Sequence, residues 1–185
     1  MAKNRDTKGD SKKSAYEKPV DEGAPQPATR SENMRWMTGF ILLSLGIFLL
    51  CSIVSYFFYW REDMSALAAS ENPIFSPIYN NVCGYYGALA GIYLVGRGFG
   101  VFALAIPAYT LLLGWRMFRS KSVRVVFITL CFSLVLILGA LTLAYIFGSN
   151  WELFGSGLGG EYGLVLTTML EGVLGGIGTL LVIIA

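Results

Sequence analysis

The chain contains 185 residues, of which 55% are hydrophobic and 14% are charged. Soluble domains typically contain about 45–50% apolar and about 25% charged residues, so the composition excludes an ordinary soluble protein. The net charge of +2 does not indicate a nucleic-acid partner, because the basic residues do not gather on one soluble face. Residues 1–33 hold seven of the 14 Lys and Arg residues and six of the 12 Asp and Glu residues. The remainder is left with long uncharged runs, which predict an integral membrane protein with a polar tail.

The tail mixes both charges with Pro, Gly and Ser and contains few apolar side chains. Such a segment cannot bury enough apolar surface to offset the entropy that it would lose on ordering. We predict a disordered cytoplasmic tail over residues 1–33, followed by one four-helix membrane domain over residues 34–185.

Four apolar runs follow the tail, and each predicts a transmembrane helix: Met37–Trp60, Phe99–Trp115, Val125–Trp151 and Gly172–Ala185. The first has 24 residues without a charge, which at about 1.5 Å per residue is enough to cross a hydrocarbon core of about 30 Å. The fourth has 14 residues, fewer than the roughly 20 that a crossing requires. It predicts a membrane helix that is truncated at the end of the chain.

The connections between these runs contain residues that interrupt regular structure. Arg61–Asn81 is polar and includes Pro73 and Pro77, which predicts a loop. Gly96–Gly98 predicts a break before the second span, and Pro107 predicts a kink within that span.

A glycine-rich stretch occurs twice in the chain. Gly84–Leu104 returns at an offset of 76 as Gly160–Leu180, with seven identical positions, four of them glycine. Because 22 of the 185 residues are glycine, chance recurrence is the alternative explanation. In each copy a G-x-x-G motif after a polar loop opens a short helix, Gly84–Arg97 or Gly163–Glu171, before an apolar run. The predicted fold is an all-α membrane protein with four transmembrane helices in two parallel repeats, each with a short glycine-entered interfacial helix.

The loops on the two sides of the predicted membrane differ in charge. Beyond residue 33, one side receives five basic residues and no acid: Arg35, Arg116, Arg119, Lys121 and Arg124. The other side receives six acids and two bases: Glu62, Asp63, Glu71, Glu152, Glu161, Glu171, Arg61 and Arg97. Because an excess of Lys and Arg marks the cytoplasmic loops of membrane proteins, we predict that both termini are cytoplasmic.

The chain has no histidine, no phosphate-binding loop with lysine and no common hydrolase motif, so no catalytic, cofactor or metal site is predicted. The candidate interaction residues are Gly84, Gly87, Gly160, Gly163, Arg97 and Glu171. The glycines allow helices to approach closely. Gly46, which has no repeat partner, is therefore expected to tolerate leucine better than Gly87 or Gly163. Arg97 and Glu171 either pair across the repeats or reach the membrane interface separately, and we prefer the second interpretation.

Four glycine-containing motifs carry a resemblance to a known family. They are Asn81-Val82-Cys83-Gly84-Tyr85-Tyr86-Gly87-Ala88, Gly98-Phe99-Gly100, Gly159-Gly160-Glu161-Tyr162-Gly163 and Leu174-Gly175-Gly176-Ile177-Gly178-Thr179. In their order and spacing they resemble the N-terminal four-helix membrane domain of FtsK-type bacterial DNA translocases. The resemblance covers about residues 34–185. It departs from the usual pattern at Cys83, where a second glycine is common in such proteins.

The resemblance implies a membrane-anchoring and division-site interaction domain of a translocase that moves chromosomal DNA at the septum. It implies a multi-pass protein of the bacterial cell inner membrane, with membrane lipids and other cell-division proteins as partners. Homo-oligomerisation, DNA and ATP would come through a motor outside this chain, so the chain itself is not predicted to be an enzyme. The alternative is a fragment of a secondary transporter or channel, which would place ionisable residues around a cavity at the membrane midplane.

Overall fold

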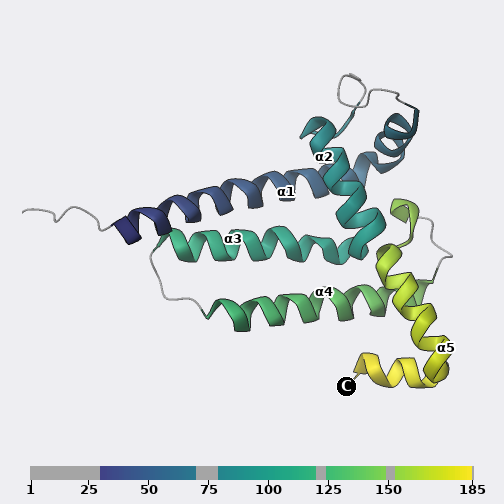
Figure 1. Ribbon diagram of the computed structural model, residues 1–185. Coiled ribbons are helices and arrows are strands. Elements are labelled where there is room, and N and C mark those ends of the chain that lie inside the picture. The colour runs from purple at the N-terminus through teal and green to yellow at the C-terminus, as the bar shows by residue number, and fades with distance from the viewer. Residues whose placement is uncertain (1–29, 70–78, 120–123, 149–152, 185) are drawn as a thin grey trace, which may run out of the picture.

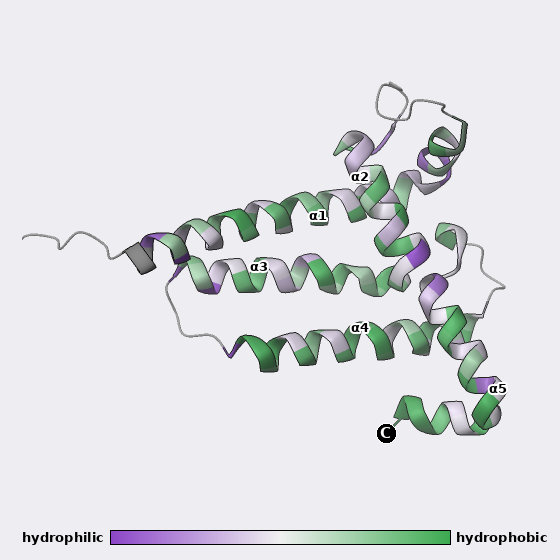
Figure 2. Cartoon of the chain, in the orientation of Figure 1, coloured by the Kyte–Doolittle hydropathy of each residue, from purple (hydrophilic) through white to green (hydrophobic). Residues whose placement is uncertain are grey.

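The computed structural model describes residues 30–69, 79–119, 124–148 and 153–184. Within these ranges every regular element is helical, and four helical segments are long and apolar enough to cross a membrane. They are Asn33–Ala69, Gly84–Phe118, Val125–Phe147 and Gly160–Ile184. Hydrophobic residues dominate all four (Figure 2). An all-helical chain with four candidate membrane spans is what the sequence predicted.

The elements follow in the order α1 (Arg30–Ala69), α2 (Gly84–Gly91), the π-helical segment η2 (Ile92–Phe99), the 3-10 segment η3 (Gly100–Leu104), α3 (Ala105–Phe118), α4 (Val125–Phe147), the 3-10 turn η4 (Leu153–Gly155) and α5 (Gly160–Ile184). Figure 1 shows α1, α3 and α4 side by side, with neighbouring helices running in opposite directions. The segments α2, η2, η4 and the first part of α5 gather at the end of the molecule where α1 and α4 finish. We call this end the glycine end.

Helix α1 is longer than predicted at both ends. It bends at Tyr59 (φ −117°, ψ 17°) and then continues to Ala69, so the predicted loop from Arg61 is wrong over its first nine residues. Residues 61–69 include Glu, Met, Leu and three Ala, which are strong helix formers although the segment also carries charge. The helix begins at Arg30, inside the predicted tail. The rest of that tail, residues 1–29, lies outside the described residues, as do Pro73 and Pro77.

Each candidate repeat bends at glycine, the first within and just after the predicted break at Gly96–Gly98, and the second three residues after Gly172, where the fourth span was predicted to begin. The first bend lies at Gly98 (φ −85°, ψ −120°) and Gly100 (φ +60°), and the second lies at Gly175 (φ +71°, ψ 169°). At an offset of 76, Gly175 corresponds to Phe99, between the two glycines of the first bend. The predicted kink at Pro107 is absent, because this proline is the third residue of α3. Its missing N–H would have no partner there, since the first four N–H groups of a helix have none within the helix.

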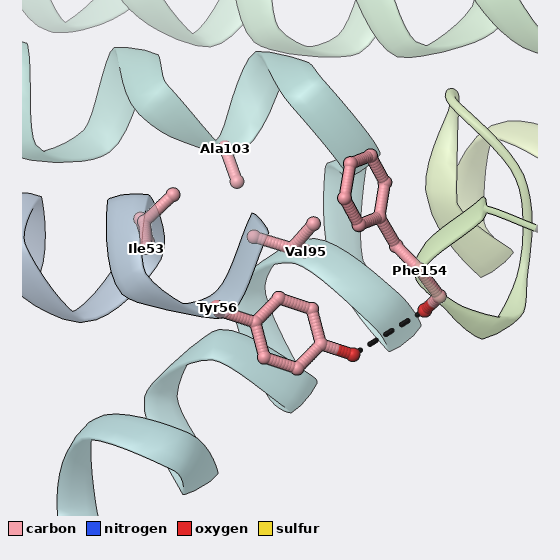
Figure 3. Close-up of a cluster of buried hydrophobic side chains, with 5 residues drawn as sticks. All are labelled: Ile53, Tyr56, Val95, Ala103 and Phe154. Carbon is pink, nitrogen blue, oxygen red and sulfur yellow. Dashed lines mark hydrogen bonds between the residues drawn. The ribbon is translucent and has the colours of Figure 1, made fainter. Parts of the chain in front are cut away.

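The buried core lies at the glycine end. Figure 3 shows its members, Ile53, Tyr56, Val95, Ala103 and Phe154, which come from α1, η2, η3 and η4. Many apolar side chains elsewhere on α1, α4 and α5 are exposed, as expected where a helix faces lipid rather than protein. The packing that positions the candidate site is therefore concentrated at one end of the bundle.

Candidate interaction site

The two G-x-x-G motifs share one local geometry. Gly84 begins α2 with φ +62°, and Gly160 begins α5 with φ +71°. A residue with a Cβ adopts this left-handed region at a cost of about 1–2 kcal/mol. In both motifs the glycine N–H donates to the carbonyl oxygen three residues earlier, at 2.8 Å to Asn81 and at 3.2 Å to Gly157. Because both donors and both acceptors are 76 residues apart, the same turn starts both helices.

The second glycine of each motif packs the new helix against the span that precedes it. A Cβ at Gly87 would lie 2.9 Å from the Ser52 Oγ atom on α1. One at Gly163 would lie 2.7 Å from the Ala140 carbonyl oxygen on α4. Real Cβ atoms essentially never approach another heavy atom closer than 3.0 Å, so both positions require glycine for this packing. Both glycines are buried.

A polar cluster that the sequence analysis missed fixes the turn before α2 to one face of α1. The buried Asn81 side chain donates from Nδ2 to the Ser52 carbonyl oxygen at 3.1 Å and accepts at Oδ1 from the Cys83 N–H at 3.0 Å. Ser55 Oγ accepts from the Val82 N–H at 3.0 Å. Asp63 Oδ1 accepts from the Asn80 N–H at 3.0 Å. Ser52, Ser55 and Asp63 lie close to helical spacing on α1, which is the signal that could have revealed this face.

The two glycine segments meet backbone to backbone at the glycine end. The Val101 N–H donates to the Leu158 carbonyl oxygen at 3.0 Å. A Cβ at Gly100 would lie 2.7 Å from the Gly160 nitrogen, and a Cβ at Gly160 would lie 2.5 Å from the Gly100 nitrogen. We call this contact the glycine crossing. It joins the first half of the chain to the second through a backbone hydrogen bond and close backbone packing, without any polar side chain.

Aromatic rings surround the glycine crossing. Phe99 stacks on Tyr162, with ring centroids 5.6 Å apart. The fully buried Tyr56 donates from its hydroxyl to the Phe154 carbonyl oxygen at 3.3 Å (Figure 3). Phe154 is the one non-glycine residue with positive φ, at 61°, among those that the structure describes. No pattern in the sequence indicates that Phe154 enters the core, because its position depends on the loop around it.

The two candidate charges do not meet. Arg97 is exposed, and its guanidinium lies over the Tyr93 ring at 5.2 Å from the centroid. Glu171 is exposed near the Gly175 bend, and it forms no ion pair with Arg97. The two residues are therefore not paired across the repeats, and their separate reach to the membrane interface stays a prediction. Within the described ranges, no group of three His, Cys, Asp or Glu side chains could hold a metal ion.

The close contact between α1 and α3 uses glycines that the repeat did not indicate. A Cβ at Gly114 would lie 2.8 Å from the Leu43 nitrogen, and one at Gly39 would lie 2.9 Å from the Phe118 Cα atom. The expected tolerance of Gly46 to leucine does not fit this geometry either, because Gly46 is buried and a Cβ there would lie 2.7 Å from the Leu111 Cγ atom. At Gly172 no atom of the described residues lies within 4 Å of the Cβ position, so this glycine is the one expected to tolerate leucine.

Comparison with known proteins gives one finding. The family described as the 4TM region of DNA translocase FtsK/SpoIIIE matches residues 32–185, which is the whole chain apart from its polar N-terminal segment. No curated protein and no solved structure matches the chain. The four candidate spans agree in number with the four transmembrane helices of that family. The chain therefore belongs to the FtsK/SpoIIIE family of DNA translocases, of which it is the four-helix membrane region.

Proposed function

We propose that this chain anchors a DNA translocase in the bacterial inner membrane and presents its glycine end to other cell-division proteins at the septum. The observation that carries the proposal is the family match over residues 32–185. In this proposal the chain holds the translocase in the membrane and binds other division proteins. DNA, ATP and homo-oligomerisation belong to the motor that accompanies such membrane regions.

Two parallel repeats are the architecture that we infer for this anchor. The shared φ and the shared turn at Gly84 and Gly160 support it, because chance recurrence of glycine would not also reproduce a hydrogen bond. In each repeat the helix between the G-x-x-G motif and the bend would lie near the membrane surface. The exposed charges of Arg97 and Glu171 close to the two bends support that placement.

The cavity between the spans gives no support to the transporter alternative. It lies between α3 and α4 and has a volume of about 220 Å³, and the described residues that line it include Tyr109, Thr129 and Ser133 but no charged side chain. Transport sites at the midplane usually contain ionisable groups that bind the substrate or the coupling ion.

The orientation that we propose places both termini in the cytoplasm. Arg35 near the start of α1, Arg116 and Arg119 at the end of α3, and Arg124 before α4 lie at the end of the bundle opposite the glycine end (Figure 1). The acids Asp63 and Glu161 lie at the glycine end, which would then face outward. The excess of arginine at one end supports this orientation.

Cysteine labelling tests the orientation. In a background without Cys51, Cys83 and Cys131, a membrane-impermeant maleimide is expected to label Val82→Cys in intact cells, since Val82 is 81% exposed at the glycine end. Lys121→Cys is expected to react only after the cells are permeabilised. Labelling of Lys121→Cys in intact cells would reverse the proposed orientation.

Localisation tests the proposed role at the division site. An N-terminal fluorescent fusion of the whole chain is expected to concentrate at midcell in dividing bacteria. Gly160→Ala is the matched variant, because it keeps all four apolar spans, and hence insertion, while disturbing the glycine crossing. We expect this variant to spread around the membrane. If the unaltered fusion were distributed evenly around the membrane, this region could not be sufficient for binding at the division site.

A further inference from the structure

A cavity of about 400 Å³ opens at the glycine end between the two halves of the chain. Part of its wall comes from α1 beyond the bend, at Met64 and Leu67, and part from α2 and η2, at Leu89 and Ile92. Phe154, Ser156 and Glu161 close it from the second half. One water occupies about 30 Å³ in the liquid, so a small organic group fits.

The charges in this cavity define the kind of ligand. Arg97 and Glu161 are the two charged side chains that line it, and both are exposed. Neither forms an ion pair within the described part of the chain, and Arg97 instead lies over the Tyr93 ring. One positive and one negative group, borne on η2 and on the first turn of α5, therefore face a common space, and neither group forms a hydrogen bond with a side chain of the described residues.

We propose that this cavity binds the headgroup of a phospholipid that carries a phosphate and a primary ammonium, as in phosphatidylethanolamine. The Arg97 guanidinium would donate to the phosphate, a pairing that is commonly bidentate. The Glu161 carboxylate would accept from the ammonium, which has three N–H donors. The apolar wall formed by Leu67, Leu89 and Ile92 would contact the glycerol and upper acyl region of the lipid.

The chemistry separates this lipid from its common neighbours. A choline headgroup has no N–H and gives Glu161 no hydrogen bond, and a glycerol headgroup has no cation at all. Lipid is favoured over a water-soluble zwitterion because the site adjoins the candidate spans and most of the residues that line it are apolar or aromatic. Free phosphoethanolamine would supply the same charges without that apolar contact.

Native mass spectrometry of the detergent-purified chain tests the proposal. The protein is offered equal amounts of ethanolamine, choline and glycerol phospholipids with identical acyl chains. We expect about a tenfold preference for the ethanolamine lipid, the size of one charge-assisted hydrogen bond. Glu161→Gln should reduce this preference to near unity, and Arg97→Gln should lower the binding of all three lipids about tenfold. Free phosphoethanolamine should not compete at equal concentration.

Glu171→Gln and Arg119→Gln are the controls, because each removes an exposed charge that does not line the cavity. Thermal unfolding of every variant checks that it is folded. An unchanged preference in Glu161→Gln, or an equal loss in Glu171→Gln, would overturn the proposed site. Competition by free phosphoethanolamine would overturn the assignment to a lipid, but the cavity would still be a binding site for the phosphoethanolamine group.

Discussion

Replacing Gly160 with alanine is expected to lower the free energy of unfolding by about 4 kcal/mol, whereas Gly84→Ala should lower it by about 1 kcal/mol. Both glycines begin a helix with nearly the same positive φ, so both substitutions incur the left-handed cost of about 1–2 kcal/mol. At Gly84 none of the described residues has an atom within 4 Å of the new Cβ. At Gly160 the new Cβ meets backbone atoms of Gly98 and Gly100, which cannot rotate away as a side chain does. Overpacking of this kind adds about 1–3 kcal/mol or more.

The measurement is unfolding of the purified chain in mixed detergent micelles, with helix content followed by circular dichroism. The pair isolates the glycine crossing because the conformational cost cancels between the two variants. Equal losses would show that backbone conformation alone explains the motif, and that the crossing adds nothing to stability. A larger loss in Gly84→Ala than in Gly160→Ala would contradict the described geometry.

Leucine at Gly163 is expected to cost about 3 kcal/mol of stability, whereas leucine at Gly172 should change it by less than about 1 kcal/mol. Both residues lie in α5, nine positions apart. The Gly163 Cβ position is 2.7 Å from the Ala140 carbonyl oxygen and 3.1 Å from its carbon, so a larger residue must separate α5 from α4. Gly172 is exposed, and no atom of the described ranges lies within 4 Å of its Cβ position, so leucine there mainly improves helix propensity.

Thermal unfolding in detergent measures this difference in stability, and the septal fluorescence of the same variants shows whether packing matters for localisation. Gly87→Leu should behave like Gly163→Leu, because its Cβ would meet Ser52 and Asn81. If Gly172→Leu lost as much stability as Gly163→Leu, the contact between α4 and α5 would not be the cause.

The first and third spans could be predicted from the sequence because an uncharged apolar run of 20 residues or more has few other uses. The second and fourth runs, Phe99–Trp115 and Gly172–Ala185, are shorter than that. Helix ends were less predictable. Charge at Arg61–Asp63 indicated a loop, yet the good helix formers after them carry α1 on to Ala69. The bends fall within a few residues of the predicted glycines because glycine tolerates backbone angles that other residues avoid.

The candidate site was predicted in part. The sequence repeat identified Gly84, Gly87, Gly160 and Gly163, because two turns with the same backbone conformation require glycine at the same positions. It did not show that one glycine segment contacts the other, since that depends on how the two halves are folded together. The partners of Asn81 on α1 were missed for the same reason. The role of Gly39 and Gly114 could not be predicted, because their contact joins two different helices and has no counterpart in the repeat.

Helix α4 is attached to the rest of the molecule mainly near one end. Its C-terminal part packs at Ala140 and Ala144 against the start of α5. Its N-terminal part is largely exposed, with a hydrogen bond of 2.7 Å between the hydroxyl groups of Thr129 and Tyr109 of α3. With 23 residues, α4 is about 35 Å long. A tilt of about 10° about its attachment at the glycine end would therefore move the far tip by about 6 Å, so a small displacement near one membrane face would become a large one near the other.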